Sequence, residues 1–158
     1  LGRMSTISAL LGRYSKHDSA IARQTLEDCG ISDLADRRVD SLSGGQRQRV
    51  AIARCLAQEP RLILADEPVS QLDPTRADEI LSLITESAQA RGATTVFVTH
   101  QPELAARFAS RIVGMSKGRI AFDTPSNGTS DYDFTVLYRG EVQECLPGYN
   151  IALVLRHN

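Results

Sequence analysis

The segment from Ser41 to Pro74 constrains the fold more than any other, because its hydrophobic pattern changes from a helical period to a strand-like run. Pro60 cannot continue the helix and predicts its end. The continuous run LILAD at 62–66 then predicts a strand that is buried on both faces of a parallel sheet. A helix that gives way to such a strand favours an α/β fold. The apolar side chains at helical spacing are Val50, Ala53, Leu56 and Ala57.

The alternation of helices and strands continues towards the C-terminus. Asp73 and Pro74 predict the start of another helix, because Asp is a good N-cap and Pro is tolerated in a first turn. The β-rich run at 94–99 predicts a second strand, a short helix is expected after Pro102, and residues 111–123 are typical of a hairpin. The order strand, helix, strand, helix, strand predicts the α/β class with a parallel core.

The two ends of the chain are less regular. Residues 1–40 are expected to be helical with interruptions. One helix within them is predicted to begin at a cap on Asp18 or Ser19 and to end near Gly30. Beyond the hairpin the sequence is rich in turn residues, and the run at 150–155 has the composition of a strand without an obvious partner.

Composition excludes several functional classes. The formal net charge of −1 gives no general attraction to nucleic acid, and 5% aromatic residues with no Trp leave little surface for base stacking. The longest apolar run, at 151–155, is too short to span a bilayer, and no secretory signal is expected. Three cysteines at irregular spacing match no metal motif and predict reduced thiols. We therefore expect no nucleic-acid partner.

Two carboxylates follow the apolar run at 62–66. Ligands of open α/β sheets bind at the carboxyl ends of the strands, so Asp66 and Glu67 are placed to act on a ligand. Asp66 is a candidate for holding Mg²⁺, directly or through water, and Glu67 is a candidate for polarising an attacking water. The alternative is a solvated acidic pair at a strand end, because short apolar runs that end in two acidic residues are common.

A glycine-rich segment, LSGGQ at 42–46, lies upstream of the acidic pair. Ser43 is a good N-cap, and Gly44 and Gly45 let the backbone approach a ligand closely. The helix behind them offers free N–H groups and the positive end of its dipole, which suit the γ-phosphate of a nucleotide. The alternative is an ordinary glycine-rich helix start, but the pattern extends through Gln46 into QRQRVAIARCLA.

The LSGGQ segment, its continuation and the motifs downstream resemble the ABC ATPase family, in which LSGGQ is the signature motif. LILADE is similar to the family's Walker B motif with its catalytic glutamate, here Glu67. SQLDP at 70–74 is similar to the D-loop, which implies that Asp73 lies at a dimer interface. VFVTHQ is similar to the H-loop segment, which implies that His100 contacts the γ-phosphate and holds Glu67 and water in register.

The resemblance covers roughly residues 1–123 and implies the fold and the domains. It implies a partial P-loop NTPase core of the RecA-like type, with a parallel sheet, joined to the helical subdomain of ABC ATPases. The implied domains are a helical subdomain remnant at 1–59, the second half of the ATPase core at 60–123 and a C-terminal tail at 124–158.

The phosphate-binding P-loop, GxxxxGK[ST], does not occur in this sequence, although ATP is the nucleotide that the resemblance implies. The two lysines are Lys16 and Lys117, and neither follows a glycine. The chain also begins at Leu1 rather than Met, so we expect it to be truncated. ABC ATPases pair head to tail, and each signature motif faces the partner's P-loop. This chain is therefore expected to complete the ATP site of a second ATP-binding subunit and to bind ATP poorly alone.

Three segments are similar to the ATP-binding subunits of bacterial phosphonate importers, at 1–18, 107–125 and 129–140. This resemblance implies a subunit that couples ATP hydrolysis to the uptake of phosphonate or a similar small anion. The implied partners are membrane permease subunits and, indirectly, a periplasmic substrate-binding protein. The implied location is peripheral, at the cytoplasmic face of the plasma membrane.

Three alternatives stay open. ATPases for polar amino acids or lipoproteins share much of this pattern. An inactive fragment, or a half-subunit that only completes a partner's ATP site, fits the missing P-loop. An ABC ATPase that acts on DNA or ribosomes is expected to have a basic face or a long coiled-coil insertion, and the sequence has neither.

Overall fold

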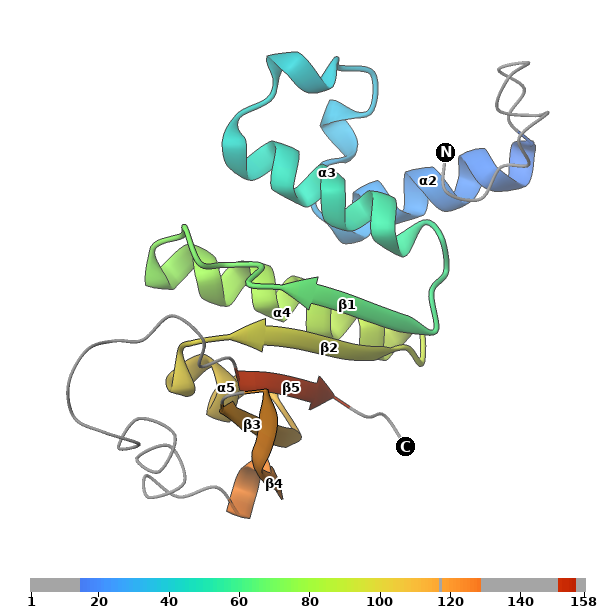
Figure 1. The fold of residues 1–158 in the computed structure, drawn as a ribbon. Coiled ribbons are helices and arrows are strands. Elements are labelled where there is room, and N and C mark those ends of the chain that lie inside the picture. Colours follow the sequence, from blue (N-terminus) through green and yellow to red (C-terminus); the bar gives the residue numbers. More distant parts are fainter. Residues whose placement is uncertain (1–14, 117, 129–150, 156–158) are drawn as a thin grey trace. The chain divides into compact units, whose positions relative to one another are not determined.

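The first of two compact units spans residues 1–60 and is helical where it is described (Figure 1). The computed structural model describes residues 15–116, 118–128 and 151–155. Helix α2 (Lys16–Asp28) begins at Ser15, whose hydroxyl accepts a hydrogen bond from the backbone N–H of Asp18. The predicted cap on Asp18 or Ser19 is therefore wrong by one turn, whereas the predicted stop at Gly30 agrees with its φ of +64°.

Two short 3₁₀ turns lead from α2 to α3 (Gly44–Leu56): η1 (Ser32–Leu34) and η2 (Val39–Ser41). The guanidinium of Arg49 on α3 donates to the carbonyl of Cys29 at 3.1 Å, which ties the end of α2 to α3. Helix α3 begins after Ser43 as predicted and ends before Pro60 is reached. The buried apolar side chains of this unit are Cys29, Ile31, Leu34, Leu42, Ala53 and Leu56.

The second unit spans residues 61–158 and contains a five-stranded sheet in the order β1-β2-β5-β3-β4 (Figure 1). Strands β1 and β2 are parallel, and β3 and β4 form the predicted antiparallel hairpin. The predicted strands at 62–66 and 94–99 are confirmed, and so is the α/β class. The strands are β1 (Leu62–Asp66), β2 (Thr94–Thr99), β3 (Arg111–Ser116), β4 (Arg119–Pro125) and β5 (Ile151–Leu155), and the 3₁₀ turn η3 (Ser126–Gly128) follows β4.

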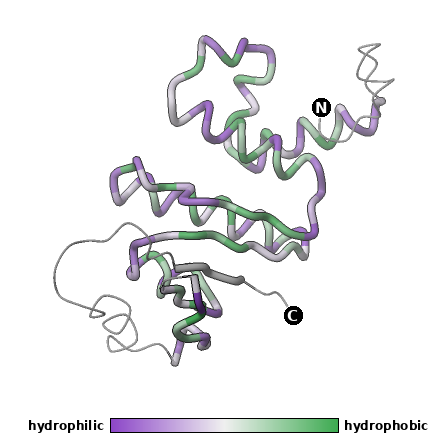
Figure 2. The backbone as a smooth tube through the Cα atoms, viewed as in Figure 1, coloured by the Kyte–Doolittle hydropathy of each residue, from purple (hydrophilic) through white to green (hydrophobic). Residues whose placement is uncertain are grey.

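Two helices connect the parallel strands. Helix α4 (Pro74–Ala90) joins β1 to β2, and α5 (Pro102–Phe108) joins β2 to β3. Figure 1 shows α4 running along β1 and β2, and Figure 2 shows that these two strands are largely hydrophobic. The helices contact each other and β2, so they cover one face of the sheet. The buried residues between them include Ile80, Leu81 and Ile84 of α4 and Ile63, Phe97 and Ile112 of the strands.

The described residues leave the opposite face of β1 uncovered, which differs from the expectation that LILAD is buried on both faces. Ile63 is buried, but Leu62 and Leu64 are 52% and 72% exposed. Successive side chains of a strand point to opposite faces, and α4 covers only one of them. An apolar run shows that a strand is hydrophobic, but it does not show how many layers cover that strand.

Strand β5 confirms the strand predicted at 150–155, and its two partners, which were not obvious from the sequence, are β2 and β3. It lies between β2 and β3 and is antiparallel to both. The division of the chain at residues 59 and 123 into subdomain, core and tail stays a prediction. Among the helices of the described residues, none is long and apolar enough to cross a membrane.

Candidate active site

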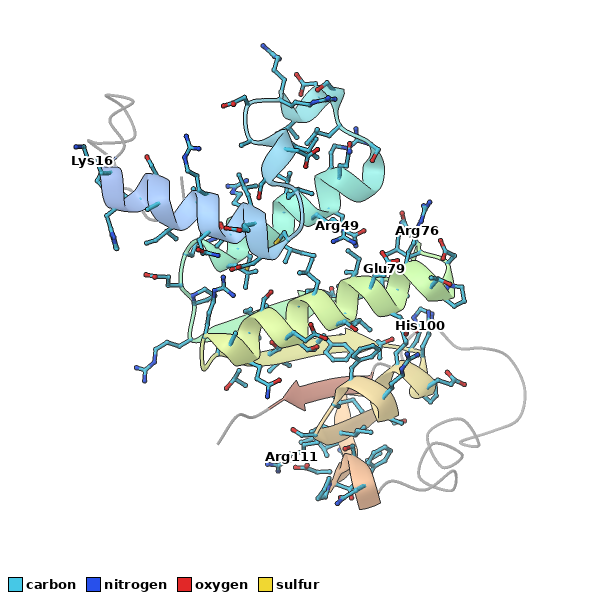
Figure 3. All side chains as sticks on the ribbon, turned by 180° about the vertical axis from the view of Figure 1, so that it is seen from behind. Lys16, Arg49, Arg76, Glu79, His100 and Arg111 are labelled. Carbon is cyan, nitrogen blue, oxygen red and sulfur yellow. The ribbon has the colours of Figure 1, made fainter. Side chains whose placement is uncertain are left out.

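The carboxyl ends of β1 and β2 bring two predicted site residues together. Because the two strands are parallel, they end at the same edge of the sheet. Asp66 is the last residue of β1 and Glu67 follows it, while His100 follows the last residue of β2. The Nδ1 atom of His100 lies 3.4 Å from Oε1 of Glu67, although the residues are 33 positions apart in the sequence. Figure 3 shows His100 at this end of β2.

The backbone holds Glu67 in this place. Its N–H donates to the carbonyl of Val98 at 3.1 Å, which extends the β1–β2 pairing by one step. Its φ of +42° lies in the left-handed region, which a residue with a side chain rarely adopts. Backbone strain of this kind costs about 1–3 kcal/mol and often occurs at functional sites.

The contact between Glu67 and His100 stabilises the protein too little to offset the free-energy cost of that backbone strain. The two side chains are 41% and 52% exposed, respectively, and an exposed ion pair contributes about 0–1 kcal/mol. The conformation of Glu67 is therefore fixed by the sheet and the following turn, in which the N–H of Ser70 donates to the carbonyl of Glu67 at 3.3 Å. The carboxylate of Glu67 thus lies beside an imidazole at a ligand-binding edge, on a strained backbone. This arrangement is suited to proton transfer.

Asp66 is exposed and lies opposite Val98 in the strand register. Its carboxylate is available for a hard cation, but the described residues contain no group of three or more His, Cys, Asp or Glu side chains that could hold a metal ion. A single carboxylate still fits Mg²⁺, which usually keeps several waters and binds one or two carboxylates together with substrate phosphates.

Asp73 caps helix α4. Its Oδ1 accepts a hydrogen bond from the backbone N–H of Arg76 at 3.1 Å, and its Oδ2 lies 3.4 Å from the Nε of Arg76. Figure 3 shows Arg76 near the start of α4. The predicted capping role is therefore confirmed. A role for Asp73 at a dimer interface stays a prediction, because the capping contacts alone account for the residue.

The signature residues form the start of α3 in the first unit. The Ser43 hydroxyl accepts from the N–H of Gln46 at 3.3 Å, and the Gln46 side chain accepts from the N–H of Ser43 at 3.0 Å. This capping box satisfies two backbone donors. A Cβ added at Gly44 or Gly45 would meet no atom of the described residues within 4 Å. Packing among the described residues therefore does not explain the two glycines, and none of these residues fills the space beside them.

Thr99 also supports the site, although no sequence motif gave it a role. Its buried hydroxyl accepts a hydrogen bond from the backbone N–H of Gln101 at 3.1 Å. This bond spans His100 and fixes the turn that leads into α5. The only local signal was a threonine at the end of a β-rich run, which is too common to predict this contact.

A family model and the most similar known proteins point to the same family. The family model for ABC transporter matches residues 3–70. The Phosphonates import ATP-binding protein PhnC 2 of Halalkalibacterium halodurans is 45% identical over 139 residues, which are 88% of this chain and 57% of that protein. The corresponding PhnC of Bordetella parapertussis is 45% identical over 141 residues, which are 89% of this chain and 55% of that protein. The chain thus spans a little more than half the length of the curated relatives it matches.

Solved structures agree with this result. A metal-chelate type ABC transporter in an inward-facing conformation superposes with a TM-score of 0.70 at 30% identity, covering 92% of this chain and 60% of that chain. The cbiO1 protein from Clostridium perfringens, part of the ABC transporter complex cbiONQ, gives a TM-score of 0.70 at 27% identity, covering 84% of this chain and 53% of that chain. Sequence, motif order and fold together place this chain in the ABC transporter ATP-binding family.

Proposed function

We propose that the chain belongs to the ATP-binding subunit of a bacterial ABC importer, which couples ATP hydrolysis to the uptake of phosphonate or a similar small anion. The observation that carries the proposal is the pairing of Glu67 with His100 at the carboxyl edge of two parallel strands. It joins a base and an imidazole from distant parts of the sequence at the edge where α/β sheets bind ligands. The names of the relatives from H. halodurans and B. parapertussis support the substrate class.

Glu67 is the proposed general base. Its carboxylate accepts the proton of the water that attacks the γ-phosphate of ATP. His100, at 3.4 Å from that carboxylate, orients it and contacts the γ-phosphate. The contact is long for a hydrogen bond, but catalytic hydrogen bonds often shorten only when the substrate is bound. A positioned general base contributes about 10²–10⁴-fold to the rate, so most of the turnover depends on Glu67.

Asp66 is the proposed carboxylate for Mg²⁺. The ion, when bound, supplies positive charge that balances the phosphate oxygens. Asp66 is exposed, adjoins Glu67 in the chain and lies at the same edge of the sheet, so it can bind the ion directly or through water. One protein carboxylate is enough for Mg²⁺, because the nucleotide and water would supply its other oxygen ligands.

The signature residues are proposed to act on the nucleotide of a second ATP-binding subunit in a head-to-tail dimer. Ser43, Gly44, Gly45 and Gln46 present the start of α3 to the γ-phosphate, with free backbone N–H groups and the positive end of the helix dipole. The open space at Gly44 and Gly45 supports a close approach by another molecule. Asp73 is proposed to lie at the same dimer interface.

The proposed assembly includes membrane permease subunits and, indirectly, a periplasmic substrate-binding protein. The proposed location is the cytoplasmic face of the plasma membrane. The names of these relatives support both, because an import ATP-binding protein must act on a membrane component to move its substrate. ATP-binding subunits for polar amino acids or lipoproteins remain an alternative, since the residues that read the substrate belong to the other components.

A second candidate is a half-subunit that only completes a partner's ATP site. This role needs only the signature residues at the start of α3. The Glu67–His100 pairing favours the catalytic proposal, because a half-subunit that only presents its signature motif has no use for it.

The catalytic proposal is tested by joining residues 1–158 to the upstream part of PhnC 2 from H. halodurans. The purified joined protein is expected to hydrolyse ATP in a Mg²⁺-dependent manner. A folded, ATP-binding joined protein without hydrolysis would contradict the catalytic proposal. A matched preparation with Glu86→Gln, an exposed carboxylate on α4, serves as the control for charge loss.

The half-subunit candidate is tested by mixing this chain with a complete subunit whose own signature motif is inactivated. Complete PhnC 2 is prepared with an aspartate in place of the second glycine of its own signature motif, which leaves its P-loop intact. Addition of the present chain is expected to restore hydrolysis at the mixed dimer, and addition of its Gly45→Asp variant is not. Equal rates with the two additions would rule out a trans role for the signature residues.

A further inference from the structure

The ring of His100 depends for its position on the backbone around it. The side chain is half exposed, so packing surrounds only part of the ring. On one side, the turn from Thr99 to Gln101 is closed by a hydrogen bond from the Gln101 N–H to the Thr99 hydroxyl. On the other side, helix α5 begins at Pro102. A change in the tilt of α5 therefore moves His100 relative to Glu67.

Helix α5 is too short to hold this tilt by itself. It has seven residues, and isolated helices shorter than about 12–15 residues are only marginally stable in water. Its buried side chains are Leu104 and Ala105, and it contacts α4, β2 and β5. These apolar contacts hold α5 against its neighbours, but the hydrophobic effect has no preferred direction. A directional contact is what would fix the tilt of the helix.

Arg107 makes such a contact. Its Nη1 donates a hydrogen bond to Oδ2 of Asp78 on α4 at 2.6 Å. The guanidinium also lies over the ring of Phe108, 5.4 Å from the ring centroid, which restricts its orientation. The side chains of Arg107 and Asp78 are 62% and 30% exposed, and exposed ion pairs contribute little to global stability. The effect of this pair should therefore be on the placement of the two helices rather than on unfolding.

The ion pair joins the two helices that begin at the candidate active site. Helix α4 begins after the turn that follows Glu67, and α5 begins just after His100. Asp78 is the fifth residue of α4 and Arg107 is the sixth of α5. At 1.5 Å per residue, both lie within roughly 10 Å of the starts of their helices. A link between them therefore acts close to the turns that carry Glu67 and His100.

We propose that Arg107 is a positioning residue for ATP hydrolysis. Through its ion pair with Asp78 it fixes α5 against α4, and it thereby holds the ring of His100 within reach of Glu67. This inference rests on the proposed function, because it gives Arg107 and Asp78 a part in the same reaction. The placement of His100 can nevertheless be measured without hydrolysis.

The first test is kinetic and uses the protein joined to the upstream part of PhnC 2. Arg107→Gln should lower kcat about fivefold, because the strength of an exposed ion pair limits how far it can bias the position of His100. The KM for ATP should stay within about twofold, since the upstream part supplies the P-loop that binds the nucleotide. Asp78→Asn should have the same effect. Arg107→Lys keeps a charged N–H donor for Asp78 and should recover most of the lost rate.

The matched control is Arg111→Gln, which removes another ion pair of the same unit. Arg111 donates to both carboxylate oxygens of Asp123 at 2.6 Å. It begins β3, which runs parallel to β2, so it lies at the opposite end of the strands from His100 (Figure 3). Arg111→Gln should leave kcat unchanged. An equal fall in kcat for Arg107→Gln and Arg111→Gln, or no fall for Arg107→Gln, would overturn the proposal.

The second test measures the position of His100 by the NMR signals of its ring, assigned with a His100→Gln protein. In the joined protein, Glu67→Gln should shift these signals, because the two side chains lie 3.4 Å apart. In the presence of Arg107→Gln, the shift caused by Glu67→Gln should fall to about half or less, as expected for coupled residues. A joined protein that does not hydrolyse ATP would refute the proposed function, but this measurement would still apply. A shift of the same size with and without Arg107 would refute the positioning role at any rate of hydrolysis.

Discussion

The start of α3 and the carboxyl edge of β1 and β2 both carry candidate phosphate-facing residues, but they are built in opposite ways. At the start of α3, Ser43 and Gln46 satisfy each other's backbone groups within one helical turn. At the strand edge, Glu67 and His100 meet only because two strands pair in one register. The first site is defined by local sequence and the second by tertiary structure. Substitutions at the start of α3 should therefore leave the sheet undisturbed, and substitutions at the strand edge should leave α3 undisturbed.

The largest expected effect is at the strand edge. In the protein joined to the upstream part of PhnC 2, Glu67→Gln should lower ATP turnover by about 10²–10⁴-fold, because the amide cannot accept the proton of the attacking water. ATP should remain bound and the dimer closed, since the nucleotide contacts are unchanged. Steady-state hydrolysis and retention of labelled ATP measure this, with Glu86→Gln as the control. Ready release of ATP from the Glu67→Gln protein would contradict the base role.

The next effect separates the two regions. Gly45→Asp in the joined protein should reduce hydrolysis by roughly 10²–10³-fold, the usual cost of losing a donor to transition-state charge, because its carboxylate would face the phosphate across the dimer. Binding of ATP to the joined protein should stay close to the unaltered level, because the P-loop comes from the upstream part. A Gly45→Ala control fits the open space and should keep more activity. Loss of nucleotide binding in Gly45→Asp would argue against a site formed in trans.

The sequence predicted well those features that are encoded within a few residues. The caps at Ser43 and Asp73 and the strands at 62–66 and 94–99 were all predicted from short patterns. The predicted start of α2 was wrong, although the cap of this helix is also encoded within a few residues. The hydroxyl of Ser15 bonds both the backbone N–H and the carboxylate of Asp18, so the helix begins one turn earlier than a cap on Asp18 predicts.

The features that were missed depend on pairing over long distances. The composition of 150–155 predicted a strand, but nothing in that run indicates β2 and β3 as its neighbours. LILAD predicted a hydrophobic strand, but not that the described residues would leave Leu62 and Leu64 exposed. The closeness of Glu67 and His100 was implied only by the family resemblance, since the β1–β2 register that creates it is not visible in either segment alone.

A smaller effect tests whether the start of α3 is self-contained. Ser43→Ala removes the acceptor for the N–H of Gln46 and should lower the free energy of unfolding by about 1 kcal/mol, the usual loss for an N-cap serine. Hydrogen exchange should rise in the first turn of α3 and stay unchanged in β1 and β2. Ser19→Ala, on the exposed side of α2, is the control and should not lower the free energy of unfolding, because Ala is the better helix former. Increased exchange at the strand edge would show that the two regions are coupled.

The smallest effect tests the opposite region, and it should have the opposite sign. The Oγ1 of Thr95 on β2 is buried and has no hydrogen-bond partner among the described residues. Thr95→Val keeps the branched shape and removes an unsatisfied hydroxyl, so the free energy of unfolding should rise by at most about 1 kcal/mol. The urea midpoint measures this change, with the partly exposed Thr94→Val as the control. The Glu67–His100 pair lies at the other end of β2, so hydrolysis by the joined protein should not change. A lower midpoint would mean that the hydroxyl is satisfied in solution, and the sheet would then depend on a polar contact as the start of α3 does.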